Sequence, residues 1–289
     1  MLDSSLSMPT ATHDEHLRAK YVALLPHGTN IYGGRISLLD DKTVVKTGEF
    51  SQLLLEAEAM RYAAKHTSIP IPVVYDVWND DEKGYLAMEF KQGRSLQTIW
   101  PKLSPEQQRS VVRTLKGYVD QLRAIPQPSD FHGAICSALN GNIMDYAVDP
   151  DDLFPSCSSE TIFNDRRIAK YAEPFKPNDA IIVRQLKEAR SGLSENHSVK
   201  FTHSDLAIWN IHVNVNGPHA DDVEITAILD WEQSGWRPEH WETFKFLSGV
   251  GSNRRLKEWR AMAFEEGVID SYSAEVGIEY EFRSIRGPL

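Results

Sequence analysis

Two nearby stretches in the second half of the chain decide its fold: VKFTHSDLAIWNIHV at residues 199–213 and VEITAILDWE at residues 223–232. The first stretch contains the pattern His-x-Asp-x4-Asn, formed by His203, Asp205 and Asn210. A pattern of this length has little specificity alone, so its value depends on the segments that follow it.

The second stretch strengthens the pattern because it ends in an acid. The apolar runs 211–213 and 225–229 flank a polar segment at 214–222, which predicts a β-hairpin. Such a hairpin brings Asp230 back to Asn210. The sequence therefore predicts that carboxylate and amide groups meet at one site.

The first third of the chain predicts a small antiparallel sheet with one helix. The first twenty residues show no periodicity, and we expect a flexible arm over 1–20. A lobe over 21–90 follows, with strands expected at 21–25, 36–39, 43–46, 73–78 and 85–90, and an amphipathic helix at 52–66.

The remainder, 91–289, predicts a larger and mainly α-helical lobe. Ser104 and Pro105 form a helix start signal, and helical patterns follow at 111–125 and 178–193. The segment 126–160 is rich in Pro and Gly and predicts a long loop region of the kind that often carries binding function. The fold class expected is α+β with two lobes.

Composition excludes several classes of protein. The 289 residues include 41 acidic and 31 basic side chains, a formal net charge of −10, and 41% hydrophobic residues, which argues against disorder. An acidic surface without a basic stripe argues against nucleic acid as a partner. The same surface would suit a cationic small molecule. The oligomeric state stays open.

Location is also constrained by the sequence. No run approaches the roughly 18 apolar residues of a membrane span, and the start of the chain lacks the pattern of a signal peptide. The only cysteines are Cys136 and Cys157, which is too few for a disulfide framework. We therefore expect a cytoplasmic protein with no membrane partner.

These motifs, in this order, resemble the aminoglycoside phosphotransferase and choline kinase family, and especially its fungal members. The resemblance extends over residues 30–245 and implies a two-lobed protein-kinase-like fold. It rests on the segments 43–46, 56–61, 67–72, 85–90, 203–210 and 229–232.

The resemblance implies a nucleotide site for ATP. Lys46 would contact the α- and β-phosphates, and a helix carboxylate would hold its ammonium group. Glu56 is the first choice, because it shares a helix face with Met60 and Ala63. Glu58, the alternative, lies about 200° further round the helix, at about 100° per residue.

The resemblance also implies the catalytic roles. Asp205 would accept the proton of the acceptor hydroxyl, while Asn210 and Asp230 would hold Mg²⁺ through oxygen atoms. His203 would be structural and support the loop from behind.

Two further segments bear on nucleotide binding. Met88 would either pack behind the adenine ring or be an ordinary core residue, and backbone groups of Glu89 and Lys91 would pair with the edge of adenine. Residues 27–35 hold three glycines and predict either a loop over the phosphates or an ordinary hairpin turn. Ser204 stands where the family usually has Gly.

The function that the resemblance implies is an ATP- and Mg²⁺-dependent transfer of phosphate to a hydroxyl of a small molecule. Aminoglycoside-like compounds, choline-like compounds and secondary metabolites all remain open as acceptors, and the acidic surface suits a cationic one. The candidate lining of the acceptor site is the loops 131–152 and 175–179, with Glu232 and Glu242 nearby or as structural partners. A catalytically silent nucleotide-binding scaffold is an alternative. A protein kinase is disfavoured, because no activation segment follows Asp230.

Overall fold

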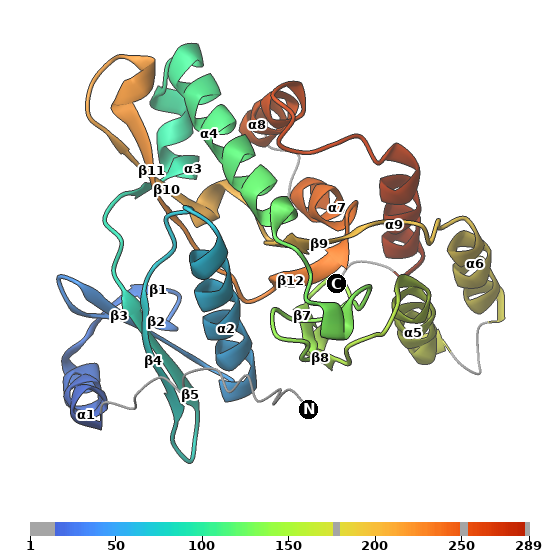
Figure 1. Cartoon of the computed structure of the whole chain (residues 1–289), viewed down its shortest axis with the longest axis horizontal. Helices are drawn as coiled ribbons and strands as arrows, with labels where there is room; N and C mark the ends of the chain where they lie inside the picture. Colours follow the sequence, from blue (N-terminus) through green and yellow to red (C-terminus); the bar gives the residue numbers. More distant parts are fainter. Residues whose placement is uncertain (1–14, 176–179, 249–253, 287–289) are drawn as a thin grey trace, which may run out of the picture.

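The computed structural model describes residues 15–175, 180–248 and 254–286 and shows two lobes (Figure 1). Within these residues, five strands form an antiparallel sheet in the order β1-β2-β3-β5-β4. The elements of this lobe are α1 (Glu15–Leu24), β1 (Thr29–Tyr32), β2 (Ile36–Asp40), β3 (Thr43–Gly48), α2 (Phe50–His66), β4 (Val74–Asn79) and β5 (Gly84–Glu89). The predicted fold class is confirmed.

The strand predicted at 21–25 is wrong, because these residues end helix α1 and begin a 3-10 turn. Arg18, Tyr21 and Leu25 recur at helical spacing, and this face docks the helix on the sheet: Tyr21 stacks on Trp78 at 6.2 Å, and Arg18 pairs with Asp76 at 2.8 Å. Of the predicted arm, residues 15–20 are helical and residues 1–14 lie outside the described residues.

Helix α2 covers the sheet because its buried face fits closely against the strands. Leu53, Ala57 and Met60 recur along one side of the helix and are at most 2% exposed. The start of α2 lies so close to β5 that a Cβ on Gly84 would be 2.5 Å from the Cα of Phe50. Glycine at 84 therefore lets the helix reach the sheet.

The second lobe is mainly helical and is built around α4, which begins as the sequence predicts. Ser104 and Gln107 form a capping box at its first turn. The other elements are β6 (Arg94–Ser95), α3 (Leu96–Ile99), α4 (Pro105–Ala124), β7 (Ile143–Asp145), β8 (Asp149–Phe154), α5 (Glu160–Ala172), α6 (Ala180–Ser191), β9 (Val199–Thr202), β10 (Ile211–Val215), β11 (Val223–Ile228), β12 (Gly235–Pro238), α7 (Trp241–Ser248), α8 (Arg254–Glu265) and α9 (Ser273–Arg286).

The predicted hairpin forms between β10 and β11, with Ile211 opposite Ile228. The region predicted as a long loop at 126–160 contains a hairpin of its own, β7 with β8. Strand β9 pairs with β12, and this ribbon leads directly into the His203 segment. Cys136 and Cys157 are free and buried.

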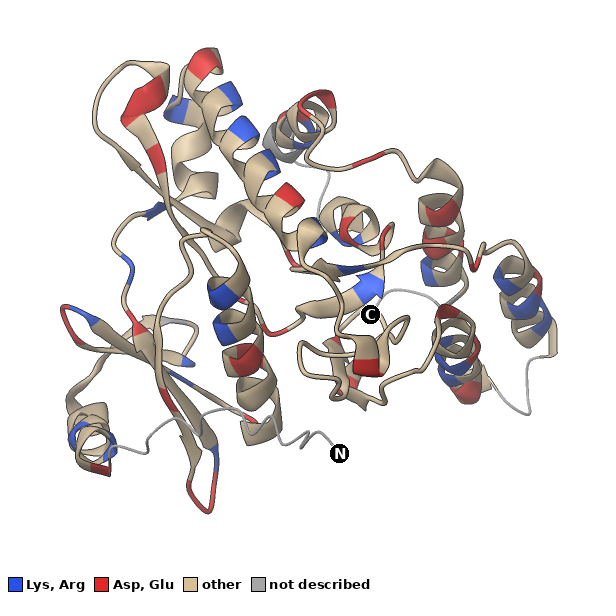
Figure 2. Ribbon diagram, in the orientation of Figure 1, with Lys and Arg blue, Asp and Glu red and all other residues tan. Residues whose placement is uncertain are grey.

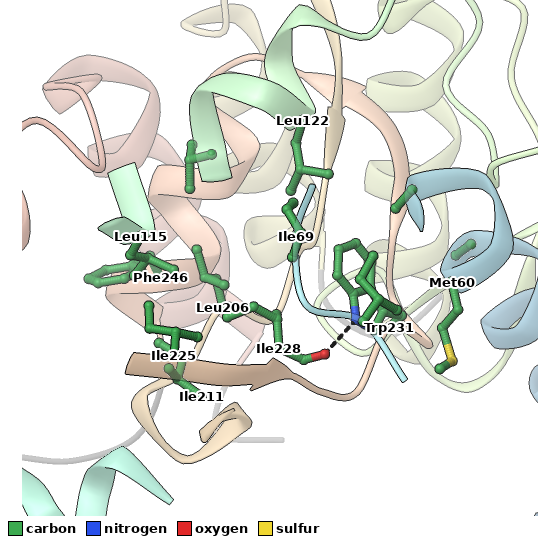
Figure 3. Close-up of a cluster of buried hydrophobic side chains, with 14 of the residues drawn as sticks. Met60, Ile69, Leu115, Leu122, Leu206, Ile211, Ile225, Ile228, Trp231 and Phe246 are labelled. Carbon is green, nitrogen blue, oxygen red and sulfur yellow. Dashed lines mark hydrogen bonds between the residues drawn. The ribbon is translucent and has the colours of Figure 1, made fainter. Parts of the chain in front are cut away.

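One apolar cluster joins the two lobes. Figure 3 shows Met60 of α2 and Trp231 on one side and Leu115 and Phe246 on the other, with Ile228 between them. The indole Nε1 of Trp231 donates to the carbonyl of Ile228 at 2.9 Å. The ends of the hairpin are therefore fixed by the core on which both lobes pack.

Charged residues of both signs mix along α4, α5 and α9 (Figure 2). Among the described residues, no helix combines the length and hydropathy that a membrane crossing requires.

A buried ion pair holds the last helix of the chain. Arg167 of α5 is 0% exposed and donates to both carboxylate oxygens of Glu279 of α9, at 2.6 Å for Nη1 to Oε2. The guanidinium also lies against the rings of Phe163, Trp241 and Phe282. On α9, Glu279 is the residue that compensates the charge of Arg167.

We predict that Glu279→Gln lowers the free energy of unfolding by about 3 kcal/mol or more, because it leaves a buried guanidinium uncompensated. Urea denaturation followed by circular dichroism measures the change. The exposed pair Arg184 and Glu188 provides the control, since Glu188→Gln should leave the midpoint unchanged. Equal midpoints for the two variants would contradict the prediction.

Candidate active site

The site is organised around the ammonium group of Lys46, which projects from β3 and is 6% exposed. Its Nζ lies 2.8 Å from Oε2 of Glu56, 2.8 Å from Oδ1 of Asp230 and 3.0 Å from Oε2 of Glu232. The partner on α2 is thus Glu56 and not Glu58. Lys46 links the sheet and the helix of one lobe to the end of the hairpin in the other.

Charge and burial oppose each other in this cluster. Burial alone would lower the pKa of Lys46, but the charges of Glu56, Asp230 and Glu232 outweigh it and raise that pKa. Burial raises the pKa of Glu56, and Lys46 opposes this rise. Lys46 is therefore held in its charged form at neutral pH.

Asp205 and Asn210 are brought together by the turn that connects β9 with β10. The amide Nδ2 of Asn210 donates to the backbone carbonyl of Asp205 at 2.9 Å and to its Oδ2 at 3.0 Å. Burial raises the pKa of Asp205 to about 7, with the charge of Lys245 acting in the opposite direction and those of Asp230 and Glu232 adding to the rise. Asp205 can thus exchange a proton near neutral pH.

His203 supports this turn from the interior. Its Nδ1 accepts from the backbone N–H of Asp205 at 3.2 Å, and its Nε2 lies 3.1 Å from the carbonyl of Leu229. Burial lowers the pKa of His203 to about 4, so the ring is neutral at pH 7, with Nδ1 accepting and Nε2–H donating. These contacts agree with the structural role expected for it.

Glu242 has a structural role, which was one of the alternatives that the sequence left open for it. It is 2% exposed at the start of α7, and its Oε2 accepts the backbone N–H groups of His203 at 2.7 Å and Ser204 at 3.2 Å. It was expected near the acceptor, but it instead orients the backbone of the turn that carries Asp205.

Glu232 also has structural partners. Its Oε2 pairs with Lys46, and its Oε1 accepts the hydroxyl of Tyr146 at 2.9 Å. Neither acid carries a sequence signal of its role, because its partners lie far away along the chain.

Two residues at the site adopt left-handed backbone conformations although they are not glycine: Ser204 at φ +61° and Asp230 at φ +65°. Ser204 is 0% exposed, and its Oγ lies 2.7 Å from Oγ1 of Thr202. The serine side chain therefore faces the interior. Its conformation explains why glycine would suit this position.

Within the segment 27–35, residues 33–35 form the hairpin turn between β1 and β2, with Gly33 and Gly34 at positive φ. Nη2 of Arg35, the last residue of the turn, lies 3.9 Å from Oε2 of Glu232. The turn thus brings a guanidinium to the edge of the Lys46 cluster.

The segment predicted to meet adenine lies at the end of β5. Met88 is 8% exposed and packs in the core. The backbone N–H of Glu89 donates to the carbonyl of Val73 at 2.9 Å, and its carboxylate pairs with Lys91 at 2.9 Å. The two charged side chains therefore neutralise each other.

Asp205 also lines a small pocket with a volume of about 20 Å³. Lys245 of α7 reaches it, with Nζ held at 2.7 Å by Oδ1 of Asp145 and at 2.7 Å by Oε1 of Gln233. The lining consists of Asp205, Leu206, Ala207, Ile208, Trp209, Lys245, Phe246, Trp259 and Arg260. Asp145 comes from the predicted lining loop 131–152, whereas 176–179 lies outside the described residues.

The two residues expected to hold Mg²⁺ each present a side-chain oxygen. Because Nδ2 of Asn210 donates to Asp205, its side-chain oxygen is the atom that can bind a metal. Asp230 is 36% exposed in its side chain, so solvent ions can reach it. Both donors are the hard oxygens that Mg²⁺ prefers.

Comparison with known proteins places this geometry in a family. A family model described as the phosphotransferase enzyme family matches residues 35–282, whereas no curated protein sequence matches the chain. Among solved structures, an aminoglycoside-3′-phosphotransferase of type VIII is 18% identical, with 86% of this chain and 85% of that chain covered and a TM-score of 0.54.

Two further structures are similar. The streptomycin-ATP complex of APH(2″)-IIa is 11% identical, with coverage of 92% and 84% and a TM-score of 0.59. The complex of APH(3″)-Id from Streptomyces rimosus with ADP and streptomycin is 12% identical, with coverage of 93% and 98% and a TM-score of 0.55. The chain therefore belongs to the phosphotransferase enzyme family and has a protein-kinase-like fold.

Proposed function

We propose that this protein transfers the γ-phosphate of ATP, with Mg²⁺, to a hydroxyl group of a small molecule. The observation that carries the proposal is the ion-pair cluster in which Lys46 contacts Glu56 and Asp230 across the two lobes. Phosphoryl transfer needs positioned cations and metal-binding oxygens more than it needs covalent chemistry, and this cluster supplies both.

The nucleotide would lie between the lobes. Lys46 would move its contacts from Asp230 and Glu232 to the phosphates while Glu56 keeps it in place. Adenine would lie against Met88, with the carbonyl of Glu89 and the backbone of Lys91 as its partners. Two of the structural relatives are complexes with ATP and with ADP, which supports nucleotide use in this fold.

Asn210 and Asp230 would hold Mg²⁺, which would supply positive charge next to the phosphates. Asp205 would take the proton of the acceptor hydroxyl, and Asn210 keeps its carboxylate oriented through the bond to Oδ2. Glu242 and His203 hold the backbone of this turn, so that the base keeps its position.

The acceptor would place its hydroxyl at Asp205 and an apolar part along Trp209, Phe246 and Trp259. Lys245 in the same lining is already paired with Asp145, so the charge of the lining does not select between a cationic and a neutral acceptor. Screening hydroxylated amines, sugars and aromatic metabolites for ATP consumption tests the proposal. Mg-ATP binding without turnover across the panel would favour a silent scaffold.

We predict that Asp205→Asn retains the rise in melting temperature caused by Mg-ATP but lowers the transfer rate by about 10²–10⁴-fold, because the proton acceptor is lost. Thermal shift and coupled ADP release measure the two effects. Asp41→Asn, at an exposed position, is the control. A parallel loss of binding and turnover would count against Asp205 as the base.

We also predict how activity depends on pH. Since Asp205 must be ionised to act as a base and its pKa is about 7, kcat/KM should fall as the pH drops below that value. Lys245 holds this pKa down, so Lys245→Met should move the acid limb to higher pH, and Lys245→Arg should restore it. The ionisation of ATP contributes equally to the pH profile of every variant, so a difference between variants comes from the protein. An unmoved limb in Lys245→Met would disprove the assignment.

A further inference from the structure

A second group of titratable side chains lies in the other part of the helical lobe. Strands β9 and β12 run antiparallel, and their last pair is Val199 with Pro238. His197 lies two residues before Val199, and His240 lies two residues after Pro238. Both histidines therefore lie beyond the same end of one ribbon, where Glu160 begins α5.

Glu160, His197 and His240 converge closely. Each offers one ligand atom, and these atoms all lie within 4.8 Å of one another. Nδ1 of His197 is 2.7 Å from Oε1 of Glu160, and the two imidazole rings are 4.5 Å apart. Tetrahedral zinc holds nitrogen and oxygen ligands at about 2.0–2.2 Å, which places the ligand atoms about 3.3–3.6 Å from one another. The contact between His197 and Glu160 would therefore open slightly, and the wider separations would close, to bring all three atoms onto one ion.

The imidazole of His240 lacks hydrogen bonds within the described residues, although it packs against the rings of Trp241 and Tyr272. It is 1% exposed, and neither Nδ1 nor Nε2 has a hydrogen-bond partner there. A neutral imidazole carries one donor and one acceptor, so both are buried without compensation, and such groups are rare in native proteins. A metal ion would bind the acceptor nitrogen.

The surroundings would orient the ligands. Oε1 of Glu279 is 4.0 Å from Nε2 of His240 and is itself held by Arg167. With Nδ1 on the metal, His240 would direct Nε2–H to this carboxylate, the arrangement that usually supports a metal-binding histidine. With Nδ1 of His197 on the metal, Oε1 of Glu275, which lies 3.4 Å from Nε2, would accept Nε2–H and orient the ring.

The local charge also suits a divalent cation. The carboxylates Glu160, Glu275 and Glu279 face the cluster together with the guanidinium of Arg167. With neutral histidines, they leave two negative charges, which one divalent ion would cancel.

We propose that Glu160, His197 and His240 form a structural zinc site. The site is separate from the Lys46 cluster and does not rest on the proposed phosphotransferase activity. Zinc would fasten the ribbon end to α5 and to the start of α7, whose Glu242 holds the turn around Asp205. The ion would thus stabilise the base of the catalytic turn without taking part in the reaction.

The test uses the untagged full chain, stripped with a chelator and then dialysed against Zn²⁺. We expect about one zinc per chain by elemental analysis after desalting, a higher melting temperature than the stripped protein, and a visible absorption band when Co²⁺ replaces zinc. His240→Phe keeps the ring volume, and Glu160→Gln keeps the polar contacts. Each should weaken zinc binding by more than about tenfold. His66→Gln, an exposed histidine on α2, should bind as the original chain does.

Two results would overturn the proposal. One is substoichiometric zinc with no change in melting temperature, which would leave Glu160 and His197 as a simple ion pair. The other is equal zinc binding by His240→Phe, Glu160→Gln and the original chain, which would mean surface binding only. If a variant fails to fold, the Co²⁺ spectrum of the original chain still decides the question.

Discussion

The ammonium group of Lys46 is the point on which the active region depends. A buried cation is unfavourable unless opposite charge surrounds it, and here Glu56, Asp230 and Glu232 provide that charge. These carboxylates come from helix α2 and from the segment after the β10–β11 hairpin. Their attraction to one ammonium therefore holds the two lobes in register, in addition to the apolar core that they share.

The catalytic turn is supported by a second layer of polar contacts. His203, Glu242 and Asn210 all bond to groups of the turn itself, so the position of the Asp205 carboxylate is defined by buried residues. Burial also raises the pKa of Asp205, and Lys245 on the pocket side limits the rise. Lys245 thus acts on the basicity of Asp205, whereas Asn210 acts on both its position and its pKa.

Much of the fold could be predicted because its signals are local. Local sequence patterns predict the hairpin after Asn210, through the spacing of apolar residues, and the cap at Ser104. Helix geometry favours Glu56 over Glu58. The strand expected at 21–25 was wrong because a short apolar run fits a strand or a helix, and only the docking of Tyr21 and Arg18 on β4 decides between them. Glu232, Glu242 and Lys245 were missed or left without a defined role because their partners are distant in sequence.

The left-handed backbone at Ser204 has a consequence for how this sequence can vary. Side chains branched at Cβ are strongly disfavoured in that conformation. Because residue 204 is also fully buried, large side chains do not fit there. Position 204 is therefore expected to accept only glycine and a few small polar residues. Serine is small enough for this buried turn and can adopt its backbone conformation, so it satisfies both constraints at once.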